Sequence, residues 1–283
     1  MTGEPLLSII TVCRDRAPGL GRTLKSFAGL DFTIIETIVI DGSENDECVL
    51  AASAFPDAVT HYWHGPDRGL YHAMNKGAGR ARGNGLLFVN AGDEIHNARR
   101  LNALVREHGA GFARAVHFGG HVQAIGPYAL PVRAPAVTAV AIAQGIFPSH
   151  QAAILPAGFS RANPYDETLR FVSDAKVLKR AFLELRHVRL DEALVVVEHG
   201  GISSLPGDWR SVLRHCREGT MLERSVPATL AFMARVLARK AVADLAGYKT
   251  LEAMQIARAL RRAGYPAGGG GALTARARTA PAE

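Results

Sequence analysis

The feature that most constrains this chain is a short apolar run that ends abruptly in polar residues. Residues 86–89 are Leu-Leu-Phe-Val, and residues 90–94 are Asn-Ala-Gly-Asp-Glu. An apolar run bounded by turn residues predicts a strand that is buried on both faces, as in a parallel sheet. In open α/β sheets, ligands bind beyond the carboxyl ends of the strands. Asp93 is therefore a candidate ligand for a divalent cation that prefers oxygen; the alternative is a solvated turn aspartate.

Strands and helices alternate at short intervals in front of this run. The patterns predict strands at residues 6–12, 34–40 and 59–63, and helices at residues 17–29, 46–54 and 70–80. Such alternation predicts an α/β fold with a Rossmann-like, mostly parallel sheet and helices on both faces. Residues 13–16, Cys-Arg-Asp-Arg, stand where a dinucleotide-binding glycine motif would be, and no Walker A motif is present. NAD-dependent redox chemistry and P-loop phosphoryl transfer are therefore not expected.

Each predicted strand is followed by polar residues, among them the acids Asp15, Asp41 and Asp93. Because parallel strands end at one edge of the sheet, these three side chains are expected to line a single crevice. Carboxylates that gather without matching lysines repel one another unless a partner offsets their charge. The expected partner is a metal ion, or a base or sugar that donates hydrogen bonds.

The positive charge is concentrated in the last quarter of the chain. The net charge is +7, yet residues from Trp209 onward hold 13 Lys and Arg against 5 Asp and Glu. We expect three parts: an α/β domain over 1–208, a basic helical region over 209–265 and a disordered tail over 266–283. The basic helices, near 222–237 and 250–262, either lie on an anionic membrane surface or pack on the main domain. Nucleic acid is not an expected partner because aromatic residues do not interleave with the basic ones.

Composition also bears on the compartment. The three cysteines form no CxxC pair, which favours a reducing cytosol and argues against a disulfide or zinc framework. No signal peptide is predicted at the amino terminus. The most apolar later windows, 134–147 and 226–238, are shorter than the roughly 20 residues that span a bilayer. The expected location is the cytoplasm, with peripheral contact to the inner face of the cell membrane as a second expectation.

The sequence resembles family-2 glycosyltransferases of the A-type fold, of the kind that build bacterial polysaccharides such as colanic acid or O-antigen. The matching pieces are 7–12 (LSIITV), 38–43 (IVIDGS), 66–77 (PDRGLYHAMNKG), 81–83 (ARG) and 87–93 (LFVNAGD). Weaker matches follow at 149–151 (SHQ), 173–174 (SD) and 200–203 (GGIS). The resemblance implies that residues 1–208 form a nucleotide-sugar-binding and catalytic domain.

The resemblance also implies roles for single residues. Asp174 would be the general base, and Asp93 would bind Mg²⁺ or Mn²⁺ on the diphosphate of a UDP- or GDP-linked sugar. The residues expected to bind the nucleotide sugar are Thr11, Val12, Asp41, Asp67, Arg68, Asn75 and Asn90, with Asp41 on the base. His150 and Gln151 are candidate acceptor contacts, and His199 is a candidate second metal ligand. For Asp174 the alternative is an ordinary first-turn acid of a helix, and for His199 it is a local hydrogen bond.

Two departures from the family pattern bear on these roles. The usual acidic triplet Asp-x-Asp-Asp is here Asn90-Ala91-Gly92-Asp93, so one carboxylate remains, and Met74 replaces a frequent arginine. Arg68 is expected to supply that missing positive charge. The predicted activity is inverting transfer of a sugar from a nucleotide-diphosphate donor to a glycan or lipid-linked acceptor. The alternatives are a catalytically degenerate nucleotide-sugar-binding protein and a sugar-nucleotide nucleotidyltransferase.

Overall fold

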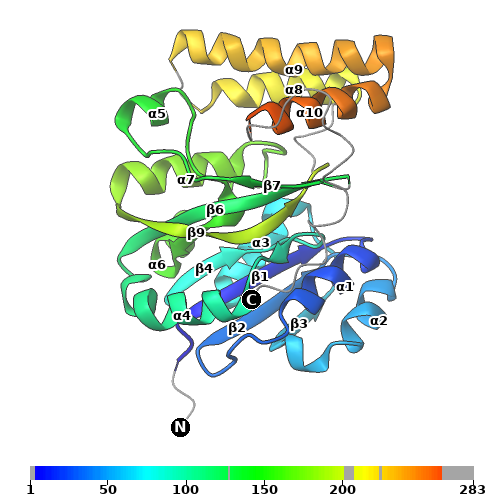
Figure 1. Cartoon of the computed structure of the whole chain (residues 1–283). Helices are drawn as coiled ribbons and strands as arrows, with labels where there is room; N and C mark the ends of the chain where they lie inside the picture. Colours follow the sequence, from blue (N-terminus) through cyan, green and yellow to red (C-terminus); the bar gives the residue numbers. More distant parts are fainter. Residues whose placement is uncertain (1–3, 127, 201–206, 223–224, 263–283) are drawn as a thin grey trace.

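The computed structural model describes residues 4–126, 128–200, 207–222 and 225–262, drawn as coloured ribbon in Figure 1. The expected tail at 266–283 and the motif residues 201–203 lie outside these ranges. The described residues form a mixed sheet covered by helices, with a further layer of three helices at one end (Figure 1).

The sheet that the described residues form contains nine strands. They are β1 (Leu7–Cys13), β2 (Ile35–Asp41), β3 (His61–His64), β4 (Gly85–Phe88), β5 (Glu94–Ile95), β6 (Ala115–Ile125), β7 (Tyr128–Val132), β8 (Ala153–Pro156) and β9 (Arg186–Glu198). The strand order is β3-β2-β1-β4-β8-β6-β9-β5, and β7 pairs with β6. Strands β3, β2, β1 and β4 are parallel, whereas β8 runs antiparallel to both β4 and β6. The sheet is therefore parallel in the amino-terminal half and mixed beyond it.

Ten α-helices accompany the strands in the described residues. They are α1 (Ala17–Ser26), α2 (Glu47–Ser53), α3 (Leu70–Arg80), α4 (Ala98–His108), α5 (Ala139–Ala143), α6 (Ala157–Ala162), α7 (Ser173–Glu184), α8 (Trp209–Thr220), α9 (Val226–Ala246) and α10 (Tyr248–Arg262). Three short 3₁₀ helices lie at Pro56–Ala58, Gly109–Gly111 and His150–Ala152.

Strand β1 shows why helices cover both faces of the sheet. All seven of its residues are buried, so neither face can be left to water. Ile9 packs in one apolar cluster with Leu24 of α1, while Ile10 packs in a second cluster with Met74 of α3. Successive side chains of a strand point to opposite faces, so one unbroken apolar segment supplies two cores.

The expected α/β fold is confirmed, and the expected elements over residues 6–89 are all present with small shifts at their ends. The helix expected at 17–29 ends at Ser26, and the strand expected at 59–63 runs from His61 to His64. In the basic region, α9 extends to Ala246, and α8 is a helix that the sequence patterns did not predict.

The helical layer is tied to the sheet domain by a buried carboxylate. Glu218 of α8 is 4% exposed and accepts hydrogen bonds from the backbone N–H groups of Arg170 (3.0 Å) and Phe171 (2.8 Å). Both residues belong to the loop in front of α7. Within the described residues, no helix combines the length and apolar character needed to cross a bilayer.

Replacing Glu218 tests this connection. Glu218→Ala leaves two backbone donors without their acceptor, so the free energy of unfolding is expected to fall by about 1–3 kcal/mol. Glu218→Gln keeps one acceptor oxygen and is expected to lose less. Urea unfolding of both variants checks this, and equal losses would show that the accepted hydrogen bonds are not what holds α8 to the loop.

Candidate active site

A cavity of about 810 Å³ opens at the edge of the sheet where the parallel strands end. Its wall includes the end of β1, the turn and first residues of α3, and the segment after β4. Three later parts of the chain complete it: the loop before α7, the end of β9, and α8. The cavity thus collects segments that lie up to 200 residues apart in the sequence.

Asp93 lies on the wall of this cavity and is largely buried, with 6% of its surface exposed. Its Oδ1 accepts a hydrogen bond of 2.9 Å from the backbone N–H of Glu198. Burial raises the pKa of Asp93 to about 6, and the negative charge of Glu198 adds to this, while the Glu198 backbone N–H and Arg16 act in the opposite direction. A cation at this carboxylate would offset both the burial and the repulsion.

Glu198 is a second acidic residue of the cavity, and the sequence patterns did not single it out. Its carboxylate is held by Arg16 at 2.8 Å and Arg22 at 2.7 Å. Gly92 has a φ of 110°, and a Cβ at that position would lie 2.4 Å from Oε2 of Glu198. A side chain at 92 would therefore be strained and would collide with Glu198. At the position where the acidic triplet would place an aspartate, the structure thus has a glycine beside a carboxylate from β9.

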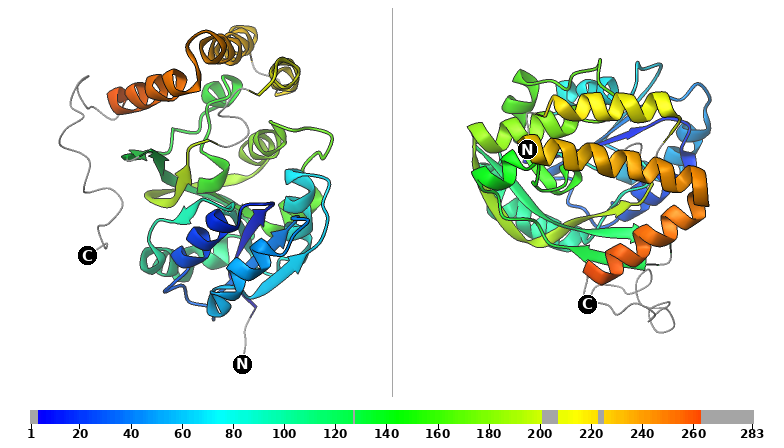
Figure 2. Two further views of the ribbon diagram at one scale, coloured as in Figure 1. Left: turned by 90° about the vertical axis from the view of Figure 1, so that its right-hand side faces the viewer. Right: turned by 90° about the horizontal axis from the view of Figure 1, so that it is seen from above.

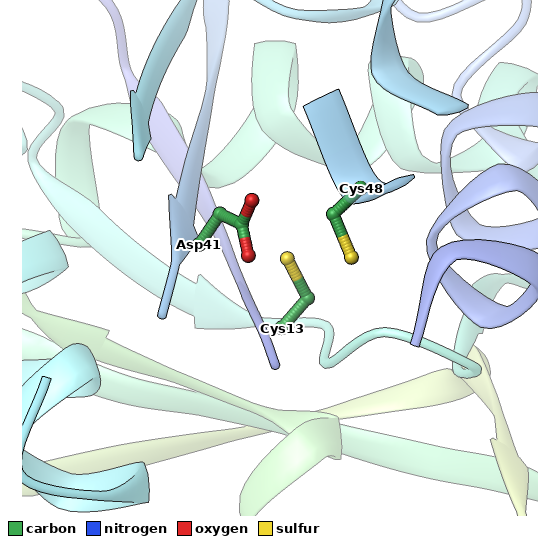
Figure 3. Close-up of side chains that lie close together, drawn as sticks. All are labelled: Cys13, Asp41 and Cys48. Carbon is green, nitrogen blue, oxygen red and sulfur yellow. The ribbon is translucent and has the colours of Figure 1, made fainter. Parts of the chain in front are cut away.

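Asp93 and Glu198 fit the chemistry of a divalent cation that prefers oxygen ligands, since both are carboxylates on one wall. A separate cluster of three potential metal ligands lies elsewhere in the described ranges. It consists of Cys13, Asp41 and Cys48, whose ligand atoms lie within 4.8 Å of one another (Figure 3). Its thiols are soft ligands, unlike the oxygens of the cavity. Burial and the charge of Asp41 raise the pKa of Cys13, so this thiol is protonated and acts as a packed core group.

Asp174 also lines the cavity, from the first turn of α7. The hydroxyl of Tyr71 donates to its Oδ1 over 3.0 Å. Burial, followed by the charge of Asp174, raises the pKa of Tyr71, so the phenol keeps its proton and remains a donor. One carboxylate oxygen is thereby fixed by the protein.

His150 lies beside this pair in the 3₁₀ helix His150–Ala152 and is 6% exposed. Its Nε2 is 2.7 Å from the hydroxyl of Tyr165. Burial lowers the pKa of His150 and raises that of Tyr165, so both groups are neutral, and the tautomer of the ring decides which of them donates. That buried Nδ1 has no hydrogen-bond partner in the described structure. Because His150 lines the cavity, this nitrogen is a polar atom that a ligand could satisfy.

Not every predicted site residue reaches the cavity. Asp15 and Asp41 are absent from its lining, so the expectation that three acids share one crevice is wrong. Asp15 is exposed in the turn after β1, with a φ of 52°. Asp41 has no exposed surface, and its carboxylate accepts from Ser43 N–H (2.9 Å), Tyr62 Oη (2.7 Å) and His64 Nδ1 (2.9 Å). Burial alone would raise the pKa of Asp41, but these three hydrogen bonds outweigh it and lower the pKa.

Thr11 and Asn75 also lie behind the wall. Thr11 is buried within β1. The side chain of Asn75 bonds to the backbone N–H and carbonyl of Tyr165 and to Glu167. In the described structure, neither side chain is therefore placed to contact a ligand in the cavity. Asn75 instead holds Tyr165 and Glu167 in place.

The remaining predicted residues do line the cavity: Val12, Asp67, Arg68, Asn90, Gln151 and His199. Arg68 is paired with Glu167 at 2.5 Å, so its charge is already matched. His199 Nε2 is 2.6 Å from Oε1 of Gln255 on α10. Two unpredicted arginines, Arg170 and Arg214, also line the cavity, and no carboxylate of the described residues lies within 4.0 Å of either guanidinium. These two arginines bring positive charge to it.

Comparison with known proteins finds a glycosyltransferase domain in the first half of the chain. The model of "Glycosyl transferase family 2" matches residues 8–129. An uncharacterized glycosyltransferase of Mycobacterium tuberculosis is 36% identical over 96 residues, which is 34% of this chain and 37% of that protein. A PGL/p-HBAD biosynthesis glycosyltransferase of Mycobacterium bovis is 32% identical over 112 residues, 37% of this chain and 43% of that protein. The matched stretch is thus less than half the length of these relatives.

Solved structures extend the likeness to nearly the whole chain. S. aureus TarS 1-349 superimposes with a TM-score of 0.56 at 20% identity, over 90% of this chain and 78% of that one. Its complex with UDP-GlcNAc gives a TM-score of 0.55 at 17% identity, over 91% and 80%. Mannosyltransferase PcManGT from Pyrobaculum calidifontis, in complex with GDP-Man and Mn²⁺, gives 0.54 at 17% identity, over 94% and 77%. Identities this low show a shared fold, and the family match adds to it over part of the chain: residues 8–129 are a family-2 glycosyltransferase domain, and the chain has the A-type glycosyltransferase fold.

Proposed function

We propose that the protein transfers a sugar from a nucleoside-diphosphate donor to a hydroxyl of a glycan or lipid-linked acceptor, with inversion at the anomeric carbon. The observation that carries the proposal is that Asp93 and Asp174, from segments 80 residues apart, line one cavity. The solved relatives that bind UDP-GlcNAc or GDP-Man share the fold, which supports a nucleotide sugar as the donor.

Asp93 is the proposed ligand of a divalent cation, Mg²⁺ or Mn²⁺, with Glu198 adding negative charge beside it. When bound, such a cation offsets the charge that builds up on the leaving diphosphate. The diphosphate oxygens of the donor would complete the coordination, because Mg²⁺ is commonly held by one or two carboxylates and substrate phosphates. His199 is the proposed additional ligand, provided that its ring is released from Gln255.

Asp174 is the proposed general base. Tyr71 donates to Oδ1, which leaves Oδ2 to accept the proton of the acceptor hydroxyl. As that proton moves to Oδ2, the acceptor oxygen bonds to the anomeric carbon, and the bond from that carbon to the diphosphate breaks. A positioned base of this kind contributes on the order of 10²–10⁴ in rate.

The other lining residues divide between donor and acceptor. We propose that Val12, Asp67 and Asn90 flank the nucleotide sugar, and that Arg170, rather than the already paired Arg68, contacts the diphosphate. For Asp41 we propose an indirect role toward the base, in which it fixes the ring of His64 at the strand end. His150, through its unpartnered Nδ1, and Gln151 are the proposed acceptor contacts.

A panel of UDP, GDP and their sugars, each with and without Mn²⁺, tests the proposal. Binding only to the folded state at 100 times the Kd adds about 2.7 kcal/mol, which raises Tm by roughly 5–10 °C for a chain of this size. Release of UDP or GDP from the sugar that binds is the second readout. A degenerate binding protein would show the Tm shift without release, and no shift with either nucleotide series would contradict the proposal.

A further inference from the structure

Helix α9 presents an apolar stripe to the outside of the molecule. At helical spacing along one side of α9, every position from the start of the helix to its last turn is apolar. The exposed members of this stripe are Pro227, Leu230, Ala231, Ala234, Leu237, Ala238 and Leu245. Leu230 is 61% exposed and Leu245 is 89% exposed. In the view from above in Figure 2, no other helix or strand of the described residues covers α9.

The inward side of α9 has the opposite character. Its buried residues are Val236, Lys240 and Ala243, so a lysine faces the protein while leucines face out. Lys240 is ion-paired with Asp244, and its Nζ lies 5.3 Å from the centre of the Trp209 ring. An ordinary surface helix buries its apolar stripe and exposes its charges. In α9 this arrangement is partly reversed.

The apolar surface continues onto the neighbouring helices. Of the sixteen large hydrophobic side chains that are exposed in the described residues, nine lie between residues 209 and 254. Besides those of α9, they include Trp209 and Leu213 on α8 and Tyr248 and Met254 on α10. Isolated exposed apolar side chains are normal, but such a concentration on one layer marks an interaction surface.

The same layer carries an excess of exposed positive charge. From residue 207 onward, the described and exposed basic residues are Arg210, Arg214, Arg217, Arg235, Lys249, Arg258 and Arg261. The exposed acids of that stretch are Asp208, Asp244 and Glu252. Apolar side chains bordered by arginine and lysine match the boundary between acyl chains and anionic headgroups.

We propose that α8, α9 and α10 form a docking surface for an anionic lipid bilayer, with α9 lying in the plane of the interface. A second copy of the chain is a poorer occupant, because a two-fold interface would bring each basic patch against itself. The proposal deepens the proposed function in one respect, since Arg214 of α8 also lines the cavity. A bilayer at this layer would lie close to a cavity that receives a lipid-linked acceptor.

Vesicle flotation of the full chain tests the surface directly. The protein is expected to float with vesicles that contain phosphatidylglycerol and to bind pure phosphatidylcholine vesicles more weakly, with binding that declines as salt rises. The double variant Leu230→Ser, Leu237→Ser is expected to lower partitioning about 10- to 100-fold, because both side chains would leave the acyl boundary. Arg217→Ser together with Arg258→Ser is expected to weaken binding to the anionic vesicles only.

Two matched controls separate the surface from general effects. Leu50 on α2 is 69% exposed, and Arg99 on α4 is exposed, and neither belongs to the layer. Leu50→Ser and Arg99→Ser are expected to bind vesicles like the unmodified protein. Every variant should show the same nucleotide-induced Tm shift as the unmodified protein. Flotation measures lipid binding alone, so a failure of the sugar-transfer proposal would not affect this test.

Three results would overturn the docking proposal. One is the absence of binding to anionic vesicles, and another is unchanged binding of the double leucine variant. The third is a concentration-dependent dimer in light scattering that disappears in the double leucine variant, together with no binding to vesicles. That result would assign the surface to a second copy of the chain.

Discussion

Asp93→Asn is expected to abolish sugar transfer and, at the same time, to raise the free energy of unfolding at pH 8 by up to about 3 kcal/mol. Asn keeps an acceptor oxygen for the backbone N–H of Glu198, so the local hydrogen bond survives. What disappears is a buried negative charge next to Glu198, together with the proposed cation ligand. A substitution that removes activity but stabilises the protein is typical of a carboxylate held in place for chemistry.

The pH dependence of stability follows from the direction of the shift. The pKa of Asp93 rises from 3.8 to about 6 on folding, so the folded state binds more protons between these values. Stability therefore falls as pH rises through this range, and the full cost of the charged group is present above pH 6. The gain of Asp93→Asn should shrink to less than about 1 kcal/mol at pH 4.

Urea unfolding in EDTA at pH 8 and pH 4 measures this gain. Asp57→Asn, at an exposed acid in the 3₁₀ helix Pro56–Ala58, is the control and should change nothing at either pH. Loss of stability in Asp93→Asn at pH 8, or full transfer activity in that variant, would contradict the role assigned to Asp93.

Asp174→Asn is expected to lower kcat by about 10²–10⁴-fold while leaving nucleotide binding intact. The amide cannot take up the proton of the acceptor hydroxyl, but it preserves the shape of the cavity wall and an acceptor for Tyr71. Tyr71→Phe should cause a smaller loss, because it frees Oδ1 without removing the base. Single-turnover transfer and the Tm shift with nucleotide separate the chemical step from binding.

Asp166→Asn is the matched control for Asp174. Asp166 lies eight residues earlier, and its Oδ1 accepts from Thr168 in a local turn. It is not part of the cavity wall. Equal losses in the Asp166 and Asp174 variants would mean that the loop geometry, rather than a proton transfer, is responsible.

The amino-terminal half of the fold could be predicted because its signals are local. Strands β1, β2 and β4 are unbroken buried segments, and α1 and α3 have regular apolar spacing. Strand β9 gives no such signal, since its first four residues, Arg186 to Arg189, are exposed. This first part is a strand because it pairs with β6 about 70 residues earlier, and its exposed residues do not signal that contact.

The site was predictable to the extent that its residues lie in motifs. Asp93 and Asp174 could be placed at a strand end and at a helix start, and both line the cavity. Glu198 could not be found, because its approach to Asp93 depends on the pairing of β5 with β9. Asp41 lies outside the cavity lining for a related reason. Its burial follows from the alignment of β2 with β3, which brings Tyr62 and His64 onto its carboxylate.

The most direct test of the account is the cation dependence of nucleotide binding. UDP and GDP are titrated into the protein by calorimetry, in Mn²⁺ and in EDTA, with the unmodified chain and with Asp93→Asn. We expect Mn²⁺ to strengthen binding of the preferred nucleotide by at least about tenfold, or 1.4 kcal/mol, in the unmodified chain and to have no such effect in Asp93→Asn. Equal affinity in Mn²⁺ and EDTA, or an undiminished Mn²⁺ effect in the variant, would contradict a cation held at Asp93.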